Sequence, residues 1–127
     1  MSETDLGNWC VEEVAGHPCD IFEPQAPNPH HYVILYLHGV HQNRLNDKEP
    51  FIREFEKYGL PVISPRTKRS WWSNRICAEF DPELTAEQHV LRNVLPFVEQ
   101  RWQSRATQVG LLGTSMGGQG ALRFSYK

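Results

Sequence analysis

The sequence predicts an α/β fold in which a mainly parallel sheet carries helices on both faces. Residues 32–37 are apolar at every position, as in a strand that has both of its faces covered. From this strand onward, strand and helix patterns alternate three times, which is typical of βαβ units. Before it, a loose alternation over residues 9–21 predicts an antiparallel hairpin at one edge of the sheet.

Length and composition are those of one modest domain, which we expect to span residues 1–127. Charged residues make up 22% of the chain and the net charge is −2, so we expect neither nucleic acid nor an anionic membrane as a partner. No apolar run approaches the roughly 20 residues of a membrane-spanning helix, and the polar, acidic start is unlike a signal peptide. Without a Cys-x-x-Cys pair, the cysteines are expected to be free thiols in the cytoplasm; they are Cys10, Cys19 and Cys77.

The first elements follow in order along the chain. The hairpin is expected to turn at residues 16–18, and the prolines of residues 24–29 make a rigid connector to the apolar strand. A helix is predicted over residues 50–58, because a proline suits its first turn and a glycine follows its end. Residues 60–64 are expected to form a further short strand.

Residues 65–82 are a long connection that is partly basic and partly aromatic. A loop of this length inside a domain is usually functional or disordered. Trp71 and Trp72 leave two interpretations open: they cover a pocket as an ordered lid, or they fill the base of the loop.

A second helix is predicted from a capping box, in which Thr85 and Gln88 can each bond to the backbone N–H of the other. Its apolar residues recur at helical spacing as far as Trp102, and Pro96 inside it predicts a kink. A short apolar strand over residues 109–112 then leads into a glycine-rich turn.

That turn, residues 113–117, fits the pattern Gly-x-Ser-x-Gly with Ser115 at its centre. In this pattern a serine stands on a sharp bend between a buried strand and a helix, so the positions two before and two after it must be small. The bend lifts the hydroxyl clear and places it near the free N–H groups of a helix N-terminus. A phosphate-binding loop has the same glycine spacing but needs Lys-Ser or Lys-Thr where this chain has Gln119-Gly120.

Four stretches together resemble the N-terminal half of an α/β-hydrolase, most of all the branch that includes esterase D and S-formylglutathione hydrolases. They are residues 37–40, 70–72, 93–97 and 112–122, and the last, Leu-Gly-Thr-Ser-Met-Gly-Gly-Gln-Gly-Ala-Leu, is the specific one. The resemblance covers most of this chain but about half of a usual family domain, and it implies that the C-terminal strands of the sheet are missing.

The resemblance implies a serine hydrolase of the esterase or thioesterase class, which forms an acyl-enzyme on Ser115 and needs no metal or organic cofactor. By position, the backbone N–H groups of Met116 and Val40 would form the oxyanion hole. His38 would shape the loop after the third strand rather than act as a base. The pocket for a small ester or thioester would be lined by Trp71, Trp72 and His41.

The chain departs from the family after Ser115, because residues 116–127 contain none of the Asp, Glu or His that complete the triad. We therefore expect a truncated and inactive chain. Two alternatives stay open: a non-catalytic fragment that forms homo-oligomers through the exposed edge of the serine strand, or a shortened site with His41 as the base. A metal site at His38-x-x-His41 has no evident third ligand.

Overall fold

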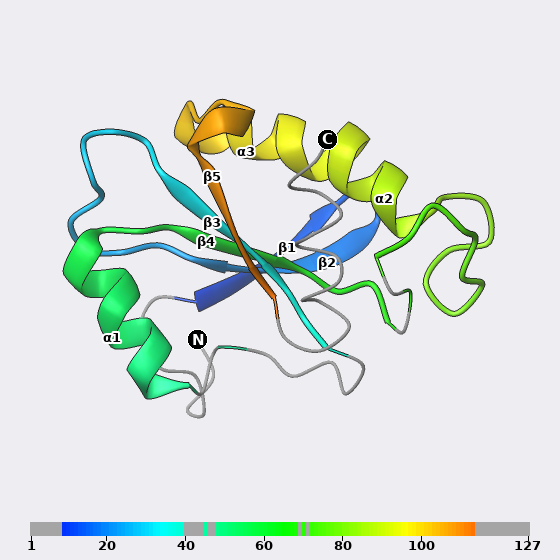
Figure 1. Ribbon diagram of the computed structural model, residues 1–127, viewed down its shortest axis with the longest axis horizontal. Coiled ribbons are helices and arrows are strands. Elements are labelled where there is room, and N and C mark those ends of the chain that lie inside the picture. Colours follow the sequence, from blue (N-terminus) through cyan, green and yellow to red (C-terminus); the bar gives the residue numbers. More distant parts are fainter. Residues whose placement is uncertain (1–8, 40–44, 46–47, 69, 71, 114–127) are drawn as a thin grey trace.

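A five-stranded mixed sheet forms the centre of the molecule, with helices against both of its faces (Figure 1). The computed structural model describes residues 9–39, 45, 48–68, 70 and 72–113. The strands are, in sheet order, β1 (Trp9–Val14), β2 (His17–Phe22), β4 (Val62–Pro65), β3 (Val33–Leu37) and β5 (Val109–Gly113). β3 pairs in parallel with β4 and β5, while β2 pairs antiparallel with β1 and β4. The predicted parallel pairing of β3, β4 and β5 and the N-terminal antiparallel hairpin are therefore confirmed, and together they make the sheet mixed.

Two helical connections cross the sheet on opposite faces. They consist of α1 (Glu49–Tyr58) between β3 and β4 and, after β4, α2 (Ala86–His89), η1 (Val90–Val94), α3 (Leu95–Trp102) and a short 3-10 turn, η2 (Ala106–Gln108). Successive residues of β3 alternate between the two layers, since Leu35 packs on the α2–α3 side and Tyr36 on the α1 side. Both faces of the sheet are covered, as the unbroken apolar run of β3 predicts.

The helix boundaries follow local capping chemistry. At the start of α2 the Thr85 hydroxyl accepts the N–H of Gln88 at 3.0 Å, and the Gln88 side chain accepts the N–H of Thr85 at 3.1 Å, so the capping box is present. Gly59 ends α1 at a φ of 63°, and a Cβ there would lie 2.3 Å from the Ala26 carbonyl oxygen. Only glycine satisfies both the conformation and the space, so the predicted end of this helix is confirmed.

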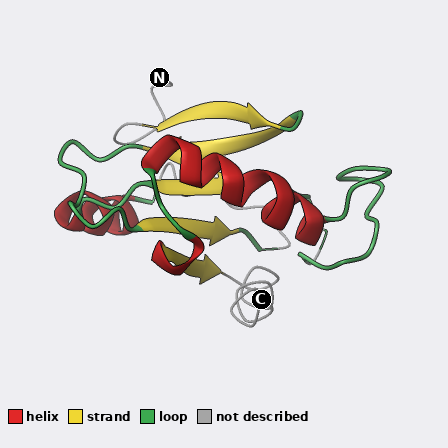
Figure 2. Cartoon of the chain, turned by 90° about the horizontal axis from the view of Figure 1, so that it is seen from above, coloured by secondary structure: helices red, strands yellow, loops and turns green. Residues whose placement is uncertain are grey.

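Pro96 changes its helix in a different way from the predicted kink. It follows the π-helical turn η1, in which the backbone hydrogen bonds span one residue more than in an α-helix. Because proline has no N–H to give, this wide turn lets the helix continue from α2 into α3 as one segment over the sheet (Figure 2). None of the helices in the described part of the chain is long and apolar enough to cross a membrane.

The β1–β2 hairpin turns earlier than the sequence predicts. Its two turn residues, Ala15 and Gly16, both have positive φ (52° and 83°), and Val14 pairs with His17 across the turn. A two-residue turn of this conformation matches the twist of the strands that it joins. His17 and Pro18 therefore belong to β2 rather than to the loop.

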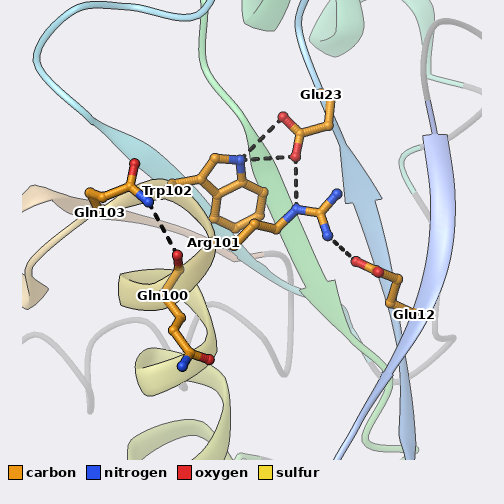
Figure 3. A network of polar contacts seen from close by, with 6 residues as sticks. All are labelled: Glu12, Glu23, Gln100, Arg101, Trp102 and Gln103. Atoms are coloured by element: carbon orange, nitrogen blue, oxygen red, sulfur yellow. Dashed lines mark hydrogen bonds and ion pairs between the residues drawn. The ribbon is translucent and has the colours of Figure 1, made fainter.

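A charged network ties the β1–β2 hairpin to the end of α3 (Figure 3). We call it the amino-edge network, because Glu23 follows Phe22, which pairs with the first residue of β4, Val62. Arg101 Nε donates to Glu23 Oε1 at 2.9 Å, and the guanidinium also pairs with Glu12 of β1. The indole N–H of Trp102 donates to both carboxylate oxygens of Glu23, at 2.9 and 3.2 Å. Burial opposes the charge of Arg101, but its bond to Glu23 and the nearby carboxylate charges outweigh this and raise its pKa. The network fastens the hairpin to the helical layer.

Candidate active site

The loops that follow β3 and β5 begin side by side. The two strands are paired in parallel up to their last residues, with Leu37 opposite Gly113. β4 lies on the other side of β3, so the order of the strands reverses at this point. In open α/β sheets, ligands bind at the carboxyl ends of the strands where such a reversal occurs. Gly113, the first residue of the Gly-x-Ser-x-Gly turn, therefore lies at the favoured position for a site.

Five of the predicted site residues lie outside the part of the chain that the structure describes: Ser115, Met116, Val40, His41 and Trp71. The helix expected after the serine also lies outside it. Their assignments stay predictions. The remaining candidates, His38 and Trp72, are described together with Gly39, and they show how the loop after β3 is held.

His38 is buried, with 3% of its surface exposed, and both of its ring nitrogens have partners. Nδ1 lies 2.9 Å from the Gly39 carbonyl oxygen, and Nε2 accepts the backbone N–H of Thr67 at 3.0 Å. These partners assign the neutral ring with its proton on Nδ1, because a carbonyl needs a donor and an N–H needs an acceptor. Burial lowers the pKa of His38, which favours the same neutral form. With both nitrogens engaged, His38 is held as a loop-shaping residue and has no free nitrogen to act as a base.

Trp72 lies against His38 and has no exposed surface. Its indole N–H donates to the His38 carbonyl oxygen at 3.1 Å, and the centroids of the two rings are 5.1 Å apart. A side chain without exposed surface packs beneath the loop and presents no face to a ligand. For Trp72, the structure therefore favours the second of the two interpretations left open by the sequence, that it fills the base of the loop.

Thr67 and Ser70 complete this group, and both are buried. Ser70 Oγ donates to Thr67 Oγ1 at 2.9 Å and accepts the backbone N–H of Trp72 at 3.2 Å. Lys68 and Trp72 have positive φ values of 57° and 54°, a conformation that side chains other than glycine rarely adopt. Such residues cost roughly 1–3 kcal/mol each and persist only where surrounding contacts hold them. His38, Thr67, Ser70 and Trp72 form what we call the carboxyl-edge network.

A second group of rings fixes the far end of the same connection, which projects beyond the carboxyl ends of the strands (Figure 1). His17 of β2 stacks on Phe80 with centroids 4.2 Å apart, and its Nε2 lies 2.8 Å from Asp81 Oδ2. His89 of α2 meets the ring of His17 edge-on at 5.1 Å and is fully buried. Burial, and then the charge of His17, lower the pKa of His89 to about 4. The connection is therefore anchored at both of its ends by a histidine.

The described part of the chain contains three free cysteines and no grouped metal ligands. Cys10, Cys19 and Cys77 all belong to it and none forms a disulfide, so the prediction of free thiols is confirmed. Burial raises the pKa of Cys19 to about 12 and also raises that of Cys10, which keeps both thiols protonated at neutral pH. Among the described residues, no three His, Cys, Asp or Glu side chains are grouped so that they could hold a metal ion.

Comparison with solved structures identifies the architecture. The chain superposes on an S-formylglutathione hydrolase from Agrobacterium tumefaciens with a TM-score of 0.69 and 18% identity, covering 93% of this chain and 51% of that one. A poly(3-hydroxybutyrate) depolymerase from Bordetella parapertussis gives 0.66 and 22%, with 94% and 46% covered. The chain has an α/β-hydrolase fold. The fold implied by the sequence resemblance is thereby confirmed.

A third α/β-hydrolase, a fluorophosphonate-binding serine hydrolase from Staphylococcus aureus, superposes with a TM-score of 0.65 and 18% identity, covering 86% of this chain and 45% of that one. The chain thus spans about half the length of these solved structures. No family model and no curated protein matches the sequence. Identities of 18–22% show a shared fold but not a shared reaction.

Sequence reasoning missed several residues of this α/β-hydrolase fold that hold the edge of the candidate site. Thr67 donates its backbone N–H to His38. Every residue except proline has such a group, so the residue type does not indicate this contact. His17 and His89 meet across 72 positions of the chain, so no spacing could pair them. Ser70 had a weak signal, since it belongs to the stretch of residues 70–72 that carries part of the family resemblance.

Proposed function

We propose that this chain carries the nucleophile and the oxyanion hole of a serine hydrolase that acts on carboxylic esters or thioesters. The observation that carries the proposal is the pairing of Leu37 with Gly113 at the ends of β3 and β5. Ser115 stands two residues beyond one of these strand ends and Val40 three residues beyond the other. Since successive Cα atoms are about 3.8 Å apart, a hydroxyl and an N–H that start from paired residues are within reach of one substrate carbonyl.

In the proposed reaction the hydroxyl oxygen of Ser115 attacks the acyl carbon and a new C–O bond forms. The electron pair of the carbonyl moves onto its oxygen, which is held by the N–H groups of Val40 and Met116, and the hydroxyl proton passes to a base. Expulsion of the alcohol or thiol, which takes up that proton, leaves an acyl-enzyme that water then hydrolyses. Two such donors contribute about 3–4 kcal/mol each to the transition state. Neither step needs a metal or an organic cofactor.

The base is the part of the reaction that this sequence does not evidently supply. His38 has both nitrogens engaged, and residues 116–127 contain no Asp, Glu or His. In this fold the acid and the histidine follow the serine along the polypeptide, and the 12 residues after Ser115 supply neither. His41 is the alternative base, and replacing it with alanine tests this. If His41 is not the base, it is proposed with Trp71 as a substrate contact, while Trp72 supports the loop from beneath.

The unpaired cysteines support a cytoplasmic location for the enzyme.

A fluorophosphonate probe tests the proposal on the intact protein that contains this sequence. We expect the probe to modify the tryptic peptide of residues 106–123, in which Ser115 is the one serine, and we expect the protein to hydrolyse simple esters or thioesters. Ser115→Ala should lose both the label and the hydrolysis. Ser125→Ala, in the neighbouring peptide, is the matched control and should retain both. Hydrolysis that survives Ser115→Ala unchanged would contradict the proposal.

A second candidate function is association through β5. This strand pairs with β3 alone among the described strands, and its residues are partly or fully exposed where those of β3 are nearly all buried. An edge strand with free N–H and C=O groups can pair with another chain, so a homo-oligomer is the expected product. Size-exclusion chromatography of the 127-residue chain, with light scattering and over a range of concentrations, tests for this association. A monomer at every concentration would contradict this candidate.

A further inference from the structure

We propose that Trp72 is a positioning residue, which acts through the His38–Gly39 and Gly39–Val40 peptide groups on the oxyanion-hole N–H that the proposed function assigns to Val40. The inference rests on the proposed function, because that function assigns the N–H of Val40 to the oxyanion hole. It goes further by naming the side chain that holds this donor in place. Trp72 comes from the connection after β4, 34 residues away along the chain.

The first of the two peptide groups is fixed by Trp72 directly. The indole N–H lies 3.1 Å from the His38 carbonyl oxygen in a buried contact, and the indole ring packs against the His38 ring. The contact is buried, because Trp72 has no exposed surface and His38 has 3%, and a buried hydrogen bond is stronger than one in water. Among the described residues, the indole N–H of Trp72 therefore holds the carbonyl of the peptide between His38 and Gly39.

The second peptide group is fixed by the ring of His38. Its Nδ1–H donates to the Gly39 carbonyl oxygen at 2.9 Å. A peptide is planar and trans, so an N–H points away from the carbonyl of the residue before it. The hydrogen bond to the Gly39 carbonyl is the described contact on which the proposed orientation of the Val40 donor rests.

This arrangement requires one tautomer of His38. The backbone N–H of Thr67 donates to Nε2 at 3.0 Å, so a proton on Nε2 would bring two donors together and leave the Gly39 carbonyl without one. Ser70 links Trp72 to Thr67, since its Oγ accepts the N–H of Trp72 and donates to the hydroxyl of Thr67. The loops after β3 and β4 are thus joined into one unit by side chains that are all neutral.

Two matched substitutions test the role of Trp72. Trp72→Phe removes the indole N–H that holds the His38 carbonyl, and Trp102→Phe removes the indole N–H that holds Glu23 at the opposite edge of the sheet. In the intact protein we expect Trp72→Phe to slow fluorophosphonate labelling of Ser115 about tenfold or more, because loss of an oxyanion donor costs about 10²–10³ and a misplaced donor costs part of that. With an ester substrate, kcat should fall while KM changes little. Trp102→Phe should change the labelling rate less than about twofold, since its N–H lies outside the site.

A spectroscopic measurement gives a readout that needs no activity. Long-range ¹H–¹⁵N spectra should show His38 as the neutral tautomer with the proton on Nδ1. The backbone amide of Val40 should shift in Trp72→Phe and stay in place in Trp102→Phe. Ser70→Ala, which removes a hydroxyl at almost constant volume, should shift the same amide by a smaller amount and provides the comparison if Trp72→Phe does not fold.

The outcomes separate the two proposals. If Ser115 is labelled and Trp72→Phe is labelled as fast as Trp102→Phe, the inference is overturned and the proposed function stands. If Ser115 of the natural protein is not labelled, the proposed function fails, and the spectra alone decide whether Trp72 positions the N–H. A proton on Nε2 of His38, or a Val40 amide that does not move in either Trp72→Phe or Ser70→Ala, would then overturn the inference.

Discussion

The two edges of the sheet are held together by different chemistry. At the amino edge, Arg101 joins Glu12 and Glu23 in a network whose charged side chains are 29–42% exposed. At the carboxyl edge, His38 is joined to Thr67 and Trp72 by neutral groups that are almost fully buried. Charged pairs tolerate water and small movements, whereas a buried neutral hydrogen bond holds only in one geometry. The comparison indicates that the amino edge stabilises the fold while the carboxyl edge fixes the loops at which the site is proposed.

The largest expected difference between the edges is their response to acid. His89 has a pKa of about 4 in the folded protein against an ordinary value of 6.5, so the unfolded chain takes up this proton first as the pH falls. The free energy of unfolding therefore does not depend on His89 protonation above about pH 6.5. It falls by about 3 kcal/mol in total as the pH drops from about 6.5 toward 4. Urea unfolding between pH 7 and pH 4 measures this loss.

Two leucine substitutions assign the acid response to one edge. His89→Leu should flatten the pH dependence, because it removes the buried titrating ring. His30→Leu, at an exposed histidine near the amino edge, should leave the dependence as it is in the natural protein. Equal slopes in the natural protein and in His89→Leu would contradict the assignment.

The next effect concerns the amino-edge network. Arg101→Met should lower the free energy of unfolding by about 1–2 kcal/mol at low salt, because it leaves two carboxylates without their shared partner. The difference should shrink in about 1 M salt, where the Debye length falls to about 3 Å. Any loss of stability in Trp72→Phe should be insensitive to salt. A salt-independent effect of Arg101→Met would remove the contrast between the edges.

A smaller effect is expected at the start of α2, which lies on the carboxyl side of the sheet. Thr85→Ala should cost about 1 kcal/mol, because the N–H of Gln88 loses its acceptor. In a double-mutant cycle with Gln88→Ala the two losses should not add, since both act on one capping box. Fully additive losses in urea unfolding would show that the box does not act as a unit.

The smallest effect calibrates the others. Arg53 and Glu49 form an ion pair on α1 at 2.6 Å, but their side chains are 72% and 66% exposed. Arg53→Ala should therefore change the free energy of unfolding by less than about 0.5 kcal/mol. A loss as large as that of Arg101→Met would mean that exposure does not separate the two kinds of ion pair.

The sequence predicts those elements whose causes are local. The apolar run of residues 32–37, the capping box at Thr85 and the glycine at the end of α1 each act within a few residues. The structure contains the strand, over residues 33–37, as well as the capping box and the helix end. The Gly-x-Ser-x-Gly pattern likewise predicts a preceding strand, which is β5. The kink expected at Pro96 takes the form of a π turn before it, because several neighbouring hydrogen bonds share the adjustment.

The two edge networks could not be predicted from the sequence, because their contacts are long-range. Arg101 and Glu12 are 89 positions apart, and Trp72 and His38 are 34 apart. The resemblance predicts that His38 shapes its loop, but the tautomer that does so depends on the backbone N–H of Thr67. Only the fold brings such groups together, so their contacts could not be predicted without knowing the order of the strands.

The most direct test of the account is a comparison of backbone amide spectra before and after a fluorophosphonate reacts with the intact protein. The account predicts that the adduct forms on Ser115 and that the largest amide-proton shifts occur at Val40 and Met116, while amides around Arg101 at the amino edge stay unchanged. An adduct on Ser115 that leaves the amide of Val40 in place, or an adduct at another residue, would contradict it.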